Sequence, residues 1–94
     1  MQLVLYSKPG CHLCEGLQEK LAQLLQPAFE LEIRDITSRP DWFQSYQYEV
    51  PVLCLLEQSE SGTVEKTLPR LSPRASLTQV AQLLQKYSSQ SERK

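Results

Sequence analysis

Residues 5–14 read Leu-Tyr-Ser-Lys-Pro-Gly-Cys-His-Leu-Cys, and this stretch decides the fold. The apolar run over residues 3–6 is typical of a short buried strand. Pro9 and Gly10 end that strand in a turn, because both residue types interrupt regular structure. A helical pattern begins at Cys11, so a strand, a turn and a helix N-terminus are predicted to meet at this cysteine.

Downstream of Cys11, helix and strand patterns alternate. Leucines recur at three- and four-residue steps, which predicts an amphipathic helix that Pro27 ends near Gln26. The next patterns predict an edge strand over residues 29–34 and a short helix capped by Ser38. A central strand over 50–56, a polar turn over 58–62 and a strand over 64–68 are predicted to form a hairpin. A last helix is predicted from a capping box at Ser76 to Tyr87.

The resulting order of elements, β-α-β-α-β-β-α, predicts an α/β fold. Its natural form is one mixed four-stranded sheet with helices on both faces. The first two strands should be parallel and joined by a right-handed crossover, and the last two should form an antiparallel hairpin. We expect a single domain over residues 1–88 and a polar, frayed tail over residues 89–94.

Composition narrows the function classes. The chain has 94 residues, a formal net charge of -1 and a hydrophobic fraction of 40%. A chain this neutral lacks the basic surface that nucleic acids or acidic membranes require, and no apolar run is long enough to span a bilayer. The first residues show neither a basic region nor a cleavage site, so we expect no secretory signal. The odd count of three cysteines argues against a secreted disulfide scaffold, and we expect a cytoplasmic protein.

Two of the cysteines, Cys11 and Cys14, form a Cys-x-x-Cys pair at the predicted helix start. Backbone N–H groups and partial positive charge at a helix N-terminus favour a thiolate, which makes Cys11 the candidate nucleophile. Cys14 follows one helical turn later on the same face and lies deeper. It is therefore the candidate resolving thiol, which attacks a mixed disulfide formed at Cys11.

Other interpretations of these residues remain open. A zinc site needs four ligands, and beyond the pair the chain offers only His12 and Cys54, so we expect no metal. His12 either polarises the thiolate or has no role. Cys54 is most simply a small core residue. Val50-Pro51 heads the central strand, where a proline gives up a hydrogen-bond donor, and its peptide bond is either cis or an ordinary trans bond.

Residues 5–14 closely resemble the active-site segment of glutaredoxins, and Val50-Pro51-Val52-Leu53 resembles the cis-proline loop of that family. The Cys-His-Leu-Cys version is similar to a small bacterial and cyanobacterial branch. The resemblance implies a thioredoxin-like fold of the glutaredoxin type. It implies Cys11 as nucleophile and Cys14 as resolving cysteine. It also implies that Lys8 binds a glutathione carboxylate, and that Val50 pairs with the glutathione main chain in a geometry fixed by Pro51.

The chain also departs from the glutaredoxin pattern. Leu13 stands where the family usually has tyrosine, so Leu13 and His12 are candidate modulators of the pair. Leu71-Ser72-Pro73-Arg74-Ala75-Ser76 stands where the family has Gly-Gly and an aspartate that grip the glutamyl end of glutathione. Pro73 donates no N–H, and Arg74 either binds an anion or is simply solvated. Whether glutathione is used is therefore open.

The sequence favours a monomeric enzyme that reduces protein disulfides or glutathione mixed disulfides. We expect no tightly bound cofactor, with glutathione as a candidate co-substrate, and no nucleic-acid or membrane partner. Two alternatives belong to other classes: a glutaredoxin-type carrier of an iron–sulfur cluster, and a non-catalytic binding module on a thioredoxin-like scaffold.

Overall fold

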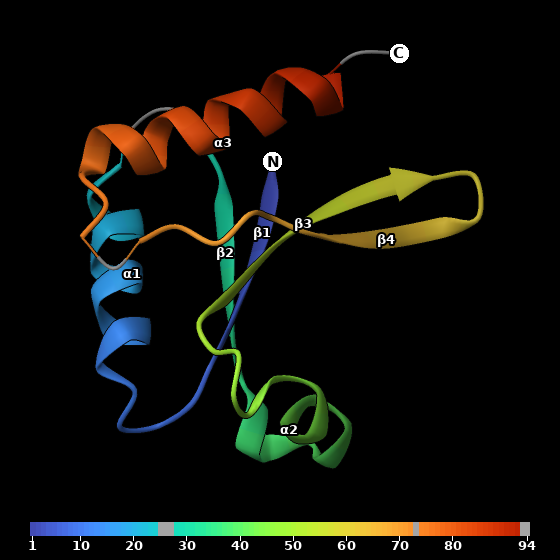
Figure 1. The fold of residues 1–94 in the computed structure, drawn as a ribbon. Coiled ribbons are helices and arrows are strands. Elements are labelled where there is room, and N and C mark those ends of the chain that lie inside the picture. Colours follow the sequence, from blue (N-terminus) through green and yellow to red (C-terminus); the bar gives the residue numbers. More distant parts are fainter. Residues whose placement is uncertain (25–27, 73, 93–94) are drawn as a thin grey trace.

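Strands and helices follow one another in the predicted order (Figure 1). The computed structural model describes residues 1–24, 28–72 and 74–92, with the backbone alone for residues 88–92. The elements are β1 (Gln2–Ser7), α1 (His12–Gln23), β2 (Glu30–Asp35), the 3₁₀ turn η1 (Ile36–Ser38), α2 (Pro40–Tyr46), β3 (Val52–Ser59), β4 (Gly62–Thr67) and α3 (Leu77–Glu92).

The strands form one mixed four-stranded sheet in the order β2-β1-β3-β4. β1 and β2 are parallel, whereas β1 pairs antiparallel with β3, and β3 pairs antiparallel with β4. The predicted α/β class, the mixed sheet, the edge position of β2 and the interior position of the strand after Pro51 are all confirmed. Two strands with apolar residues on both faces, β1 and β3, fill the centre of the sheet.

Alternate residues of the central strands enter two separate cores. Leu3 and Leu5 of β1 lie in the core that α1 and α3 cover, which contains Leu21, Val80 and Leu84. The intervening Val4 and Tyr6 lie in the other core, against which Trp42 and Tyr46 of α2 pack. The period-two alternation of a strand thus divides the helices between the two faces, as predicted.

The first helix ends earlier than predicted. α1 ends at Gln23, and its C-cap residue Leu24 has extended backbone angles, with its N–H donating to the carbonyl of Leu21 at 3.2 Å. The leucine period continues to Leu25, so periodicity alone overestimated the length of the helix. The predicted end at Gln26 and Pro27 lies outside the described residues.

The second helix is not capped by Ser38, so that prediction is wrong. Asp35 caps the preceding 3₁₀ turn, accepting from the Thr37 N–H at 2.9 Å, and the Ser38 hydroxyl donates to the Asp35 carbonyl at 2.6 Å. The N-cap of α2 is Arg39, which makes no side-chain capping bond. Pro40 occupies the first helical position, where the missing N–H leaves one donor fewer to satisfy.

The β3–β4 hairpin turn is tighter than predicted. β3 continues to Ser59, and Ser59 pairs directly with Gly62, so the loop shrinks from the predicted residues 58–62 to residues 60–61. Gly62 has a φ of +120°, which glycine adopts readily because it has no Cβ. The hairpin projects beyond the rest of the sheet (Figure 1).

The last helix begins as predicted and ends later. The capping box is confirmed: the Ser76 N–H donates to Gln79 Oε1 at 2.8 Å, and the Gln79 N–H donates to Ser76 Oγ at 3.1 Å. The helix continues past Tyr87 to Glu92, because residues 88–92 contain neither glycine nor proline to end it. Among the helices of the described residues, none is both long enough and apolar enough to cross a membrane.

Candidate active site

Cys11 occupies the N-cap of α1, directly after the turn that ends β1. Gly10 adopts a φ of +80°, and the Cys11 N–H donates to the carbonyl of Lys8 at 3.2 Å, which closes the turn. The Cys11 sulfur accepts the backbone N–H of Cys14 at 3.1 Å, so the sulfur itself takes the place of the usual capping oxygen. The predicted position of Cys11 at the helix start is confirmed.

Cys11 and Cys14 are joined by a disulfide, with their Cα atoms 5.3 Å apart. Cys14 is only 2% exposed and belongs to the core on the α2 face of the sheet, whereas Cys11 is half-buried at its edge. An incoming sulfur therefore meets Cys11 first, and Cys14 lies beneath it. In the reduced pair, the same N–H donor and the helix dipole would favour a thiolate at Cys11.

The two residues between the cysteines face away from the core. The His12 side chain is 92% exposed, and its Nδ1 lies 3.5 Å from Glu15 Oε1. Leu13 is 50% exposed. The described contact of His12 is with a carboxylate rather than with sulfur, and its predicted role at the thiolate stays a prediction. Leu13 and His12 both line a groove on this side of the molecule.

The segment between α2 and β3 is tied to the active-site turn. Lys8 Nζ donates to the carbonyl of Gln47 at 3.3 Å. The Val50 N–H donates to the carbonyl of Tyr46 at 3.0 Å, and the Val50–Pro51 peptide bond is cis. The structure thus joins the turn that carries Cys11 to the segment that carries Val50. Of the backbone groups of Val50, which the family resemblance pairs with glutathione, the N–H thus has an internal partner.

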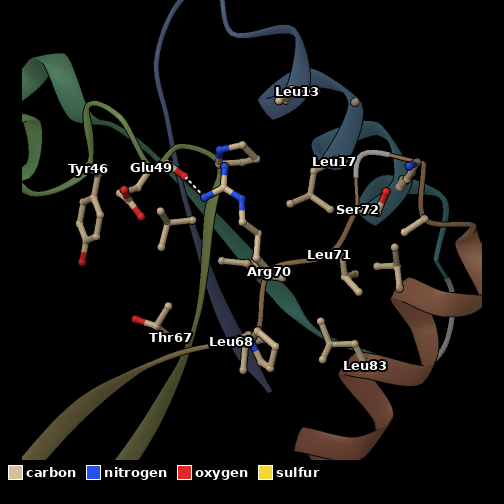
Figure 2. Close-up of a pocket in the computed structure, with 18 of the residues that line it drawn as sticks. Leu13, Leu17, Tyr46, Glu49, Thr67, Leu68, Arg70, Leu71, Ser72 and Leu83 are labelled. Atoms are coloured by element: carbon tan, nitrogen blue, oxygen red, sulfur yellow. Dashed lines mark hydrogen bonds between the residues drawn. The ribbon is translucent and has the colours of Figure 1, made fainter.

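A groove with a volume of about 740 Å³ is lined by His12 and Leu13, the two residues between the cysteines, and by Pro51. Residues of α1, of the segment after β4 and of α3 also line it (Figure 2). Its walls are mainly apolar and include leucines from α1, β3, the segment after β4, and α3: Leu13, Leu17, Leu53, Leu68, Leu71 and Leu83. Five of these leucines fall in predicted helices or strands, Leu71 falls between them, and no pattern in the sequence predicted the groove.

Arg70 lies across this groove, and sequence reasoning missed it. Its Nη1 donates to the carbonyl of Glu49 at 2.8 Å, which links the segment after β4 to the segment before Pro51 (Figure 2). The available signal was its place directly before residues 71–76, where the chain departs from the glutaredoxin pattern.

Two backbone amides of the segment before α3 are already satisfied. The Arg74 N–H donates to Ser72 Oγ at 3.1 Å, and the Ala75 N–H donates to the Ser72 carbonyl at 2.9 Å. The Arg74 side chain is exposed, and Pro73 lies outside the described residues. Because both N–H groups donate to Ser72, neither of them is left to bind an anion.

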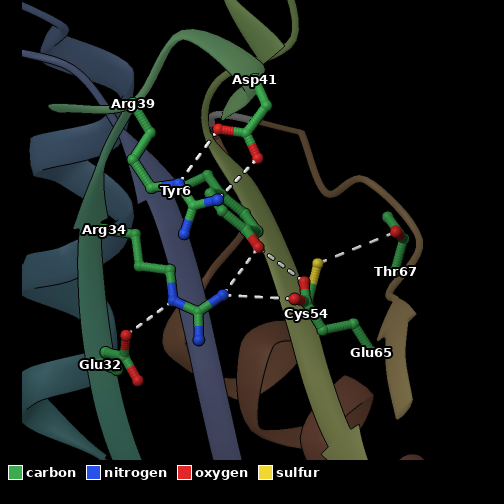
Figure 3. A network of polar contacts seen from close by, with 8 residues as sticks. All are labelled: Tyr6, Glu32, Arg34, Arg39, Asp41, Cys54, Glu65 and Thr67. Carbon is green, nitrogen blue, oxygen red and sulfur yellow. Dashed lines mark hydrogen bonds and ion pairs between the residues drawn. The ribbon is translucent and has the colours of Figure 1, made fainter. Parts of the chain in front are cut away.

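A polar network crosses the sheet on the α2 face (Figure 3). The Tyr6 hydroxyl donates to Glu65 Oε1 at 2.7 Å and accepts from Arg34 Nη1 at 2.9 Å. Arg34 also pairs with Glu65 at 3.2 Å and with Glu32 at 2.6 Å. Burial is the main cause that raises the pKa of Tyr6 well above its ordinary value. This network joins β2, β1 and β4 and satisfies the buried hydroxyl.

Cys54 lies near this network and is 1% exposed, as expected for a core residue. Its sulfur lies 3.8 Å from Thr67 Oγ1. Burial raises the pKa of the Cys54 thiol, and the hydrogen bond with Thr67 lowers it to a lesser degree. Within residues 1–24, 28–72 and 74–92, no three His, Cys, Asp or Glu side chains gather as a metal-binding group.

The buried thiol predicts a loss of stability in alkali. Above about pH 8.5 an unfolded cysteine ionises, whereas folded Cys54 keeps its proton because its pKa is raised. The unfolded state then binds fewer protons than the folded state, so the free energy of unfolding falls as the pH rises toward the folded pKa of Cys54. Urea midpoints measured between about pH 8 and 10 should decline, and less steeply in Cys54→Ala. An equal decline in both proteins would contradict this prediction.

The sequence profile described as "Glutaredoxin-like domain (DUF836)" matches residues 2–85, nearly the whole chain. The chain belongs to this glutaredoxin-like family. The match includes the active-site turn, the cysteine pair and the segment around Pro51. No curated protein matches the chain significantly.

Solved structures place the glutaredoxin-like domain in the thioredoxin fold. It is similar to thioredoxin 1 from Thermosipho africanus, with a TM-score of 0.63 and 18% identity, covering 99% of this chain and 100% of that one. It is also similar to the structural-genomics target XcR50 from X. campestris, with a TM-score of 0.55 and 27% identity over 89% and 96% of the two chains. The Trx4 domain of ERdj5 gives a TM-score of 0.64 and 16% identity over 95% and 80%. A thioredoxin-like fold with a closely spaced cysteine pair is consistent with a redox function.

Proposed function

We propose that this protein is a thiol–disulfide oxidoreductase that reduces disulfides through Cys11 and Cys14. One observation carries the proposal: the half-buried Cys11 sulfur accepts the Cys14 N–H at the N-terminus of α1, within bonding reach of a buried second sulfur. The arrangement supplies a stabilised thiolate and a partner that resolves its mixed disulfide.

The reaction begins from the dithiol. The Cys11 thiolate attacks a substrate disulfide, a bond forms between Cys11 Sγ and one substrate sulfur, and the other substrate sulfur leaves as a thiolate that takes a proton from water. Cys14 then loses its proton and attacks Cys11 Sγ, which releases the second substrate thiol. The substrate gains two electrons, and the protein is left with the Cys11–Cys14 disulfide. A donor thiol restores the dithiol.

The surrounding residues position the substrate in this proposal. Lys8 carries an ammonium with three donors. Among the residues that the structure describes, one of them donates to the Gln47 carbonyl, and the others can donate to a substrate carboxylate. Because the Val50 N–H is bonded to Tyr46, we assign substrate pairing to the Val50 carbonyl, beside Pro51. Protein disulfides and glutathione mixed disulfides are the candidate substrates. We further propose a cytoplasmic monomer with no tightly bound cofactor and glutathione as a candidate co-substrate.

The pH dependence of Cys11 alkylation tests the proposal. In the reduced protein, alkylation of Cys11 by iodoacetamide should reach half its maximal rate below about pH 7.5, because the helix N-terminus lowers the pKa of the thiol. Trypsin leaves Cys11 and Cys14 on one peptide, residues 1–20, so fragmentation of that peptide in the mass spectrometer assigns the modification to one of the two cysteines. Buried Cys54, whose pKa is raised, is an internal reference and should stay unmodified over the same range. A half-maximum near pH 8.5, the value of an ordinary thiol, would overturn the proposal.

A further inference from the structure

The groove beside the disulfide suggests which substrate the pair receives. Its lining is mainly apolar and includes Leu13, between the cysteines, and Leu83 on α3. We infer that this groove holds a bulky apolar side chain next to the cysteine of a peptide disulfide, so that the protein prefers such peptides to glutathione. The inference rests on the proposed reduction through Cys11 and names the substrate class.

Position is the first argument. His12 and Leu13, the two residues between the cysteines, line the groove together with Pro51. A substrate whose sulfur reaches Cys11 must place the atoms on either side of that sulfur near these residues. A side chain next to the substrate cysteine can then enter the groove. It could not reach a cavity far from Cys11.

The chemistry of the wall is the second argument. Leu17 on α1, Leu71 after β4 and Leu83 on α3 are half-buried and line the groove from three separate elements (Figure 2). Each leaves apolar surface exposed to water, and a leucine-sized side chain would remove part of that surface from solvent on both partners. The volume of about 740 Å³ exceeds the space that one side chain fills, so adjoining peptide atoms also fit.

Two backbone amides argue against glutathione as the preferred occupant. Glutathione presents two carboxylates and an ammonium, and it has no bulky apolar side chain. The Arg74 and Ala75 amides donate to Ser72 and so are engaged. Within the described part of the chain, Arg70 donates to the Glu49 carbonyl through Nη1, and the other N–H groups of its guanidinium can donate to a main-chain carbonyl of a peptide. The site thus offers a peptide an apolar wall and a donor for its backbone.

Matched probes test the preference. Two acetylated, amidated pentapeptides, Ala-Leu-Cys-Leu-Ala and Ala-Ser-Cys-Ser-Ala, and glutathione itself are each joined through cysteine to thionitrobenzoate. Attack by Cys11 on the cysteine sulfur of the probe releases thionitrobenzoate, which is coloured, and leaves a Cys11–probe disulfide that Cys14 resolves. The second-order rate constant of colour release with the pre-reduced protein is measured for each probe.

The leucine peptide should react about tenfold faster than the serine peptide or the glutathione probe, as expected for burial of one apolar side chain. Leu83→Asn should reduce this ratio to about threefold or less, and Leu83→Met should preserve it because its side chain is similar in size and polarity. Leu77→Asn is the matched control. Leu77 is also on α3 and 38% exposed, but it does not line the groove, so the variant should keep the full ratio. Urea midpoints of all variants check that they stay folded, because the thiols of an unfolded fraction would react with every probe alike and lower the ratio.

The possible results of this experiment distinguish a wrong groove assignment from a wrong proposed function. A ratio near one in the natural protein, with all probes reduced, would overturn the groove assignment and leave the reductase intact. An unchanged ratio in Leu83→Asn, or an equal loss in Leu77→Asn, would also overturn it. If none of the probes released colour, the proposed function would fail and the groove assignment with it.

Discussion

Replacing Cys11 with serine should lower disulfide reduction by at least about a hundredfold, because a hydroxyl does not ionise near neutral pH and forms no mixed disulfide. The cap itself should survive the change, since serine is a favoured N-cap residue and its oxygen can accept the Cys14 N–H that the sulfur now accepts. The loss would therefore report on chemistry and not on folding. Colour release from a thionitrobenzoate mixed disulfide gives the rate, and the urea midpoint checks stability.

The other two cysteines provide the contrast. Cys14→Ser should still attack the probe but should accumulate the Cys11–probe disulfide, visible as an added mass, because nothing resolves it. Cys54→Ser should keep the natural rate, since Cys54 lies in the core and outside the pair. Full activity in Cys11→Ser, or loss of activity in Cys54→Ser alone, would exclude the mechanism.

The sequence predicted the features that depend on local chemistry. The strand, turn and helix start around Cys11 follow from apolar patterning and from the breakers Pro9 and Gly10, and the structure confirms all of them. The capping box at Ser76 is equally local, because both of its hydrogen bonds lie within one helical turn. Ser38 does not cap the second helix because its hydroxyl donates to the carbonyl of Asp35, which itself caps the preceding 3₁₀ turn. Both residue types favour caps, and their propensities alone do not show which of them forms the cap.

Features that depend on distant residues were not predictable from one sequence. The bond from Arg70 to Glu49 spans 21 positions, and the bond from Lys8 to Gln47 spans 39. Each arises only once the sheet brings separate loops together. The groove likewise needs the relative placement of α1, α3 and the segment after β4. Tyr6, read only as a strand residue, bonds Glu65 across 59 positions, and no pattern in the sequence indicated this pair.

Replacing Tyr6 with alanine should cost about 3–5 kcal/mol of the free energy of unfolding, as large aromatic truncations in cores do. Tyr6 is 2% exposed. Its ring stacks on Tyr46 at a centroid distance of 4.4 Å and meets the edge of Trp42 at 5.7 Å. Both rings belong to α2 and pack against the core on this face of the sheet, so the truncation leaves a cavity beneath the helix. Since small domains are stable by about 5–15 kcal/mol in total, the urea midpoint should fall steeply.

Tyr6→Phe separates packing from polarity in this prediction. Phenylalanine keeps the ring and removes only the hydroxyl, and Arg34 and Glu65 still pair with each other at 3.2 Å, so the cost should be about 1 kcal/mol. Tyr48→Ala is the surface control. Tyr48 is 87% exposed, and its loss should change stability by less than about 0.5 kcal/mol. If Tyr6→Phe proved as costly as Tyr6→Ala, the hydrogen bonds to Glu65 and Arg34 would hold this face of the sheet, and the stacking of α2 on Tyr6 would contribute little.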